Sequence, residues 1–129
     1  MKKHVSGTQR LILGLAANLI LLLAAVIGYR VGAGMIWTVF PILHFALSIL
    51  HFFCADSLPR LTLLCGAHLL CAVGGIALAG RMYFDSVARD VEGEAILLLE
   101  LIIGAAIVLM LSLIVLLVKR ITLKNAEQP

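Results

Sequence analysis

The sequence predicts an all-α integral membrane protein, built as a bundle of four transmembrane helices that run up, down, up and down. Two observations carry this prediction. The 129 residues are 63% hydrophobic and only 13% charged, whereas globular chains are about 45–50% apolar and about 25% charged. The apolar residues also fall into four long runs, and a run of about 20 such residues spans the hydrocarbon core of a bilayer. We therefore expect a single membrane domain over residues 1–129.

The first two predicted spans cover residues 11–29 and 33–55. The first span follows a cationic N-terminal segment and carries no charge of its own. The second span also lacks charged residues, and it is long enough to cross the bilayer with some tilt. It contains Pro41, which removes one backbone hydrogen bond and predicts a kink in the helix.

The third and fourth predicted spans cover residues 61–80 and 95–118. A tight turn that contains Asp, Ser and Pro separates the second span from the third and predicts a helical hairpin. Residues 81–94 are the only long polar connection and form the predicted outer loop. Apolar residues recur at every fourth position within this loop, which favours a short helix lying on the membrane surface.

The distribution of positive charge predicts that both termini lie in the cytoplasm. If the N-terminus is inside, seven Lys and Arg residues fall on the cytoplasmic side, and three, Arg30, Arg81 and Arg89, fall on the outer side. Cytoplasmic segments of membrane proteins carry such an excess of positive charge. Short turns make neighbouring helices antiparallel. A bacterial cytoplasmic membrane fits this charge bias and the compactness of the chain.

Glu100 is the residue that most strongly indicates a function, because it is the only acidic residue within a predicted span. A charged residue in a span is costly, and it usually faces the bundle interior or a cavity. Counting residues from the end of the span puts Glu100 about 7–8 Å inside the outer boundary. We expect its carboxyl group to be either neutral or paired with Arg30 or Arg81, and not to pair directly with His44.

Glu100 and three polar residues at other depths are candidates for a proton or ion pathway. His44 lies near the midplane of the bilayer, and Asn18 and His68 lie about 10 Å from its cytoplasmic side. Proton relays in membranes use chains of acidic residues and histidines. The same side chains are also explained without a pathway, because histidine and asparagine form hydrogen bonds between neighbouring helices in lipid.

The central hairpin holds three of the four histidines and all three cysteines. His51, Cys65 and His68 are candidates for a metal or haem site, since imidazole and thiolate are ligands of transition metals. The expected hairpin register puts His51 level with Cys65. It puts His44 level with Cys71, so that no two histidines lie at equal depth. No Cys-x-x-Cys spacing occurs, and we predict no cofactor and no metal.

Small residues mark the faces on which the helices are expected to pack, because helices in lipid approach each other through small side chains and occasional amides. The predicted packing residues are Gly14, Asn18, Ala25 and Gly28 in the first span, Gly75 in the third and Gly104 in the fourth. Four spans in so short a chain bury little surface. We therefore expect homo-oligomers, or assembly with another membrane protein.

The sequence favours a non-enzymatic membrane subunit that associates with itself or acts as an accessory to another membrane protein. No P-loop, His-Glu-x-x-His or Gly-x-Ser-x-Gly motif occurs, so we predict no enzymatic activity. The net charge of +3 comes from residues at the ends of the spans, which argues for the lipid bilayer and against nucleic acid as a partner. Two alternatives stay open: a small transporter or proton or ion conductor, and a haem or metal protein.

In size and number of spans the chain is similar to the small multidrug exporters. Those proteins carry an essential glutamate in the first span, and the first span of this chain has no acidic residue. The similarity is therefore one of architecture.

Overall fold

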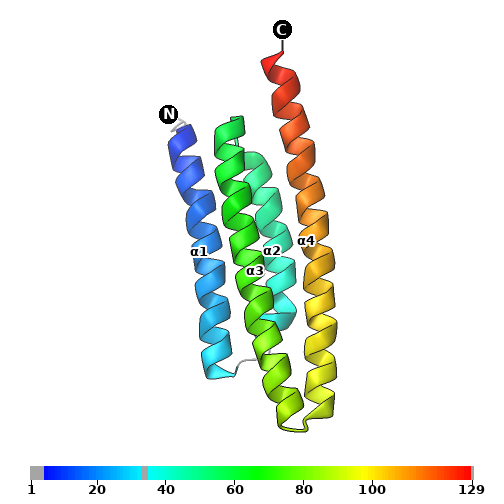
Figure 1. Cartoon of the computed structure of the whole chain (residues 1–129). Coiled ribbons are helices and arrows are strands. Elements are labelled where there is room, and N and C mark those ends of the chain that lie inside the picture. The colour runs from blue at the N-terminus through cyan, green and yellow to red at the C-terminus, as the bar shows by residue number, and fades with distance from the viewer. Residues whose placement is uncertain (1–4, 33–34, 129) are drawn as a thin grey trace.

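Four long helices make up the computed structural model, which describes residues 5–32 and 35–128 (Figure 1). Each helix is long and apolar enough to cross a membrane. The prediction of an all-helical chain with four potential spans is thus confirmed. The helices are α1 (Gly7–Val31), α2 (Met35–Cys54), α3 (Leu58–Ala88) and α4 (Glu92–Glu127).

The helices lie side by side, with α1 and α4 at opposite corners of the bundle. Both α2 and α3 contact α1 on one side and α4 on the other, and they also touch each other. Within the described residues, α1 and α4 make no contact. In Figure 1 the turn between α2 and α3 lies at the same end of the bundle as the two ends of the chain.

α1 begins at a capping box. Ser6 Oγ accepts a hydrogen bond from the backbone N–H of Gln9 at 3.2 Å, and Gln9 Oε1 accepts one from the N–H of Ser6 at 2.9 Å, so two otherwise free donors are satisfied. The helix ends at Gly32, whose φ of 67° lies in the left-handed region that glycine adopts without strain. The buried residues in between recur every three or four positions, so that one stripe of α1 faces the bundle.

Only residues 55–57 join α2 to α3. Ser57 occupies the position before the first turn of α3, and Pro59 lies within that turn, where its missing N–H costs little. Asp56 accepts a hydrogen bond from Arg60 Nη1 at 2.7 Å. This bond holds the pKa of the Asp56 carboxyl below its usual value.

The predicted outer loop over residues 81–94 is largely helical. α3 continues through most of it, and only residues 89–91 connect α3 to α4. The extension contains no glycine or proline that would stop a helix. Arg81 Nε also lies 3.7 Å from Asp85 Oδ1, one turn further on. α3 ends just before Asp90, whose φ of 59° is left-handed. The apolar run therefore predicted the part of α3 that can cross a membrane, but it did not predict the polar extension of this helix.

The other helices also differ from the predicted spans. α1 starts before residue 11, and α4 continues beyond residue 118 as far as Glu127. α2 contains Pro41 and continues past it to Cys54. Lys2, Lys3 and residues 33–34, which are the first two of the second predicted span, lie outside the described residues.

Two clusters of buried apolar side chains fill the bundle. The cluster nearer the α1–α2 connection includes Leu21, Ala25, Trp37, Phe40 and Ala79. The cluster at the α2–α3 turn includes Cys54, Ala55, Leu61, Leu64 and Leu116. The buried polar residues of α2 lie between Phe40 and Cys54, where the two clusters meet.

Candidate functional site

Three histidines and one asparagine meet in the core of the bundle, and we call this group the histidine cluster. His44 and His51 come from α2, His68 from α3 and Asn18 from α1. None of the four residues is more than 4% exposed. His44 and His51 lie two helical turns apart, so they share one face of α2. The cluster therefore joins three of the four helices.

The His68 ring contacts both histidine rings of α2. Its centroid lies 3.7 Å from that of His44, with 26° between the two planes, so these rings are stacked. The centroid of His51 lies 5.3 Å from that of His68, and the planes meet at 81°, edge to face. Phe40 extends the stack beyond His44 at a centroid distance of 5.9 Å. Three imidazole rings are thus in continuous contact inside the bundle.

Two hydrogen-bonding contacts fix the protonation of the rings on α2. Asn18 Nδ2 donates to the carbonyl oxygen of Gly14 at 2.9 Å, and it lies 2.8 Å from His51 Nε2. His44 Nε2 lies 3.1 Å from the carbonyl oxygen of His68. An amide nitrogen only donates and a carbonyl oxygen only accepts. In their neutral forms, His51 therefore carries its proton on Nδ1 and His44 carries its proton on Nε2.

Several polar atoms of the histidine cluster have no protein partner. Within the described residues these are both ring nitrogens of His68, Nδ1 of His51 and Oδ1 of Asn18. An unpartnered polar group in a protein interior costs about 1–3 kcal/mol. These atoms therefore have hydrogen-bonding capacity that no residue of the described chain uses.

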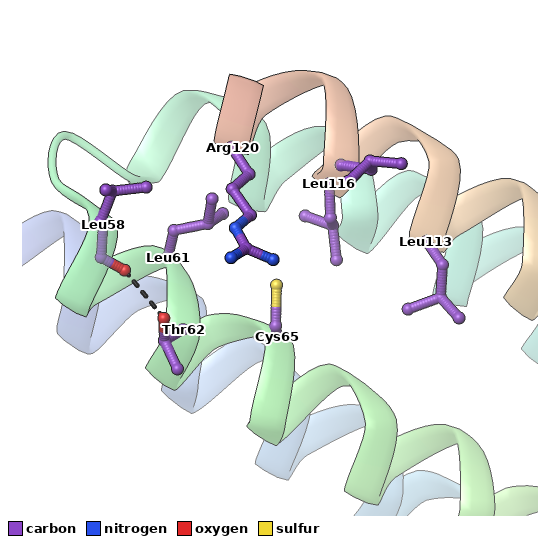
Figure 2. Close-up of a pocket in the computed structure, with 8 residues that line it drawn as sticks. Leu58, Leu61, Thr62, Cys65, Leu113, Leu116 and Arg120 are labelled. Atoms are coloured by element: carbon purple, nitrogen blue, oxygen red, sulfur yellow. Dashed lines mark hydrogen bonds between the residues drawn. The ribbon is translucent and has the colours of Figure 1, made fainter. Parts of the chain in front are cut away.

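Within the described residues, the geometry of the histidine cluster does not support the haem or metal alternative. The stacked rings of His44 and His68 leave no room for a macrocycle between them. Across residues 5–32 and 35–128, no three His, Cys, Asp or Glu side chains are grouped so that they could hold a metal ion. Cys65, one of the candidate ligands, lines a groove shared with α4 (Figure 2). All three cysteines are free thiols.

The register of the hairpin differs from the expected one. The sequence predicted that His44 lies level with Cys71, and that no two histidines share a depth. In the structure His44 stacks on His68 instead. The reason is the position of the turn: residues 55–57 lie between the helices, and their centre is about two residues before that of the turn over residues 56–60 that the sequence suggested. In an antiparallel hairpin, an earlier turn moves the partner of each residue back along the second helix, here by three residues, from Cys71 to His68.

Glu100 lies apart from the histidine cluster, on the exposed side of α4. Only four of the 36 residues of α4 are buried, namely Ala95, Leu98, Ser112 and Leu116. Among the described residues, Glu100 forms no ion pair with Arg30 or Arg81. The predicted pathway is therefore brought together only in part: Asn18, His44 and His68 meet, and Glu100 does not join them.

The predicted packing residues fall into two groups. Those buried in the bundle are Gly14, Asn18, Ala25, Gly28 and Gly75. A side chain added at Gly14 would come within 2.5 Å of Leu64 Cδ2 and 3.3 Å of His51 Nδ1, so the helices approach closely here. A side chain added at Gly104 would meet nothing within 4 Å. A side chain at Gly104 would therefore find open space and not a neighbouring helix.

A groove of about 480 Å³ between α3 and α4 is a feature that the sequence analysis did not predict. The charge pattern indicated only the end of a span at Arg120, yet this residue lines the groove. Leu113, Leu116 and Leu117 precede Arg120 by seven, four and three residues. This spacing, which puts all four on one face of a helix, is the signal in the sequence that could have revealed the groove.

No protein-family model, no curated protein and no solved structure matches the chain.

Proposed function

We propose that the chain is a non-enzymatic, multi-pass membrane subunit that associates with further copies of itself through α1 and α4. One observation carries this proposal. Arg30 on α1 and Glu100 on α4 are both exposed, and they belong to the two helices that make no contact within the described part of the chain. Opposite charges on opposite corners of one copy can pair only between copies.

The two charges lie at about the same level of the bundle. α1 and α3 run in the same direction (Figure 1), and a side chain at Gly74 of α3 would meet Leu22 of α1. Arg30 lies eight residues beyond Leu22, so it is level with the position eight residues beyond Gly74 on α3. That position lies about eight residues before the centre of the connection over residues 89–91. The same level is reached on α4 about eight positions after that centre, which is within one turn of Glu100.

Pairing between copies would remove a substantial cost. An unpaired charge in or near hydrocarbon is unfavourable. If the α1 face of one copy packs on the α4 face of the next, the guanidinium and the carboxylate neutralise each other where screening by salt is weak. The contact is head-to-tail, because α1 and α4 lie at opposite corners, and it repeats from copy to copy. Two α4 faces packed on each other would instead juxtapose like charges.

The histidine cluster supports the non-enzymatic part of the proposal. Its two hydrogen-bonding contacts run from one helix to another, from His51 to Asn18 and from His44 to the backbone of His68. Polar residues used in this way hold helices together in lipid. The cluster therefore acts as a fixed core, and the contacts that carry function lie on the outer surface.

The proposed topology is up-down-up-down with both termini on the cytoplasmic side, in a bacterial cytoplasmic membrane. The excess of Lys and Arg on that side supports it, at seven residues against three. The test uses a variant in which the three native cysteines are replaced. A cysteine at Gly93, an exposed position, should then react with an impermeant thiol reagent in intact cells. A cysteine at Asn125 should not react, and the reverse pattern would contradict the topology.

The oligomeric state in native lipid tests the proposed function. The wild type, extracted together with its surrounding lipid, should have a mass well above that of one 13.9 kDa chain. Glu100→Gln and Arg30→Gln should each shift the population toward monomer. Glu94→Gln is the matched control, because Glu94 Oε2 lies 3.9 Å from Arg89 Nη2 of its own chain. A wild type that is monomeric at every concentration in native lipid would overturn the proposal.

A second candidate function, proton conduction through the bundle, is favoured by the contact among the three imidazoles and by the unpartnered nitrogens of His68. Chains of histidines serve as proton relays in membranes. In proteoliposomes that hold a pH-sensitive dye, His68→Gln should then abolish proton entry. Glu100→Gln should leave proton entry unchanged, because Glu100 lies outside the cluster. A wild type that does not conduct protons would rule this candidate out.

A further inference from the structure

The groove between α3 and α4 is apolar along most of its length and lies near the α2–α3 turn (Figure 2). Leu61 and Leu116 are buried within it, at 3% and 2% exposure. Leu113 and Leu117 are 37% and 52% exposed and border its opening. The residues that line the groove are Leu58, Leu61, Thr62, Cys65, Leu113, Leu116, Leu117 and Arg120.

Among the described residues, Arg120 is the one charged residue that lines the groove. Figure 2 shows its side chain crossing from α4 toward Thr62 and Cys65 of α3. Helical side chains lean toward the N-terminus of their helix, which here directs the guanidinium back along α4 toward the leucines. Within the described residues no carboxylate pairs with Arg120. The Thr62 hydroxyl already donates to the carbonyl oxygen of Leu58 at 3.0 Å.

The neighbouring cations of α4, Lys119 and Lys124, do not line the groove. Lys119 Nζ lies 4.8 Å from the centroid of the Phe52 ring on α2. Lys124 is exposed, one turn beyond Arg120. Arg120 is therefore the basic residue of α4 that is positioned to hold an anion at the groove.

We propose that the groove binds a membrane lipid with an anionic phosphate headgroup, drawn from the leaflet at the α2–α3 end of the bundle. The planar guanidinium of Arg120 pairs with two phosphate oxygens at once. The leucines of α3 and α4 line the path of one acyl chain, and the distance along α4 from Arg120 to Leu113 is about 10 Å. A volume of 480 Å³ lies within the range of about 300–1,000 Å³ typical of ligand sites.

A lipid fits this groove better than a soluble anion does. A soluble anion would use only the guanidinium and would leave the apolar walls uncovered. A zwitterionic lipid would fill the walls, but its cationic headgroup would weaken the contact with Arg120. Basic pockets between transmembrane helices bind anionic headgroups for the same electrostatic reason.

Native mass spectrometry of the full chain in detergent, with dioleoyl phosphatidylglycerol or dioleoyl phosphatidylcholine added, tests the proposal. The wild type should bind phosphatidylglycerol about tenfold more tightly, as expected for one well-placed charge pair. Arg120→Gln should abolish this preference, and Arg120→Lys should keep part of it, because lysine retains the charge but loses the planar fork.

Lys124→Gln is the matched control, because it removes the same charge from the same helix outside the groove. It should keep the wild-type preference. An equal loss in Arg120→Gln and Lys124→Gln would show diffuse attraction to a basic helix end and would overturn the site. Equal binding of the two lipids by the wild type would overturn it without any variant, so the test does not depend on the variants folding.

Two further measurements separate the acyl chain from the headgroup. Leu113→Trp fills the groove without changing the charge, and it should weaken binding of phosphatidylglycerol; unchanged binding would contradict the acyl path. Glycerol phosphate, which has the headgroup chemistry and no acyl chains, should not displace the bound lipid. Displacement at millimolar glycerol phosphate would identify a site for soluble phosphate esters and would overturn the assignment to a lipid.

Discussion

Among single side chains, Asn18 makes the contact that links α1 to the histidine cluster. Its amide nitrogen donates hydrogen bonds to the Gly14 carbonyl oxygen and to His51 Nε2 at the same time. Without this amide, a fully buried imidazole nitrogen of His51 would have no partner. A sequence count could place Asn18 on a packing face, but it could not pair Asn18 with His51, because that pairing depends on how α1 and α2 are rotated.

The link between Asn18 and His51 can be measured with a double-mutant cycle. Asn18→Ala and His51→Phe should each lower the free energy of unfolding in detergent. Their coupling energy should be about 0.6–1.7 kcal/mol, the upper range for polar contacts between transmembrane helices. A coupling energy of zero within error would mean that the 2.8 Å contact does not stabilise the bundle.

The pair between Asp56 and Arg60 predicts a small dependence of stability on pH. The bond from Arg60 lowers the pKa of Asp56 in the folded chain from its usual 3.8. The pair therefore stabilises the fold above about pH 4, and its contribution is lost as the pH falls through the lowered value. The thermal midpoint of the wild type should fall more steeply below pH 4 than that of Asp56→Asn.

The effect at Asp56 should be modest, because both side chains of the pair are about one-third exposed. It should also shrink in high salt, as the attraction between partly exposed charges does. Identical acid profiles for the wild type and Asp56→Asn would show that the pair does not stabilise the α2–α3 turn.

Among the helices, α1 is the one in which a sequence pattern indicates which side faces the bundle. Small and polar residues recur along one stripe, and that stripe faces the bundle, with Gly14, Asn18, Ala25 and Gly28 all buried. α4 carries no such pattern, because it is apolar on every side. A helix that is hydrophobic all round does not indicate which side faces its neighbours. The outward position of Glu100 could therefore not be predicted.

The ends of the helices and the register of the hairpin could also not be predicted from the sequence, each for a physical reason. Hydropathy reports the thickness of hydrocarbon and not the end of a helix, so the polar extension of α3 from Arg81 to Ala88 was assigned to an outer loop with a short helix on the membrane surface. The register of α2 against α3 depends on the exact position of one turn. The predicted turn lay about two residues too late, which paired His44 with Cys71 instead of His68, so the stack at the centre of the site was not predicted.

The close approach of α1 to α2 and α3 requires a residue without a side chain at Gly14. A side chain at this position would meet Leu64 Cδ2 and His51 Nδ1. Gly14→Val should therefore push α1 outward and destabilise the chain by about 1–3 kcal/mol, the usual cost of overpacking. Gly66→Val is the control in another helix, because nothing lies within 4 Å of its side-chain position. Equal thermal midpoints for the two variants would contradict the close approach.

At the level of the whole molecule, the arrangement of the helices is the basis of the proposed association between copies. α2 and α3 each pack on both outer helices, whereas α1 and α4 make no contact within the described residues and expose Arg30 and Glu100, respectively. One copy therefore offers two complementary faces that its own chain cannot bring together. The proposed association is therefore head-to-tail and repeats from one copy to the next.

The proposed pairing of Arg30 of one copy with Glu100 of the next can be tested by reversing each of the two charges. Arg30→Glu makes both sides of the contact acidic, and Glu100→Arg makes both sides basic. Each variant, expressed alone with two different tags, should fail to co-purify with itself from native lipid. Expressed together, the two variants should co-purify, because every mixed contact again joins opposite charges. Self-association of either variant at the wild-type level, or no association of the two together, would contradict the proposed pairing.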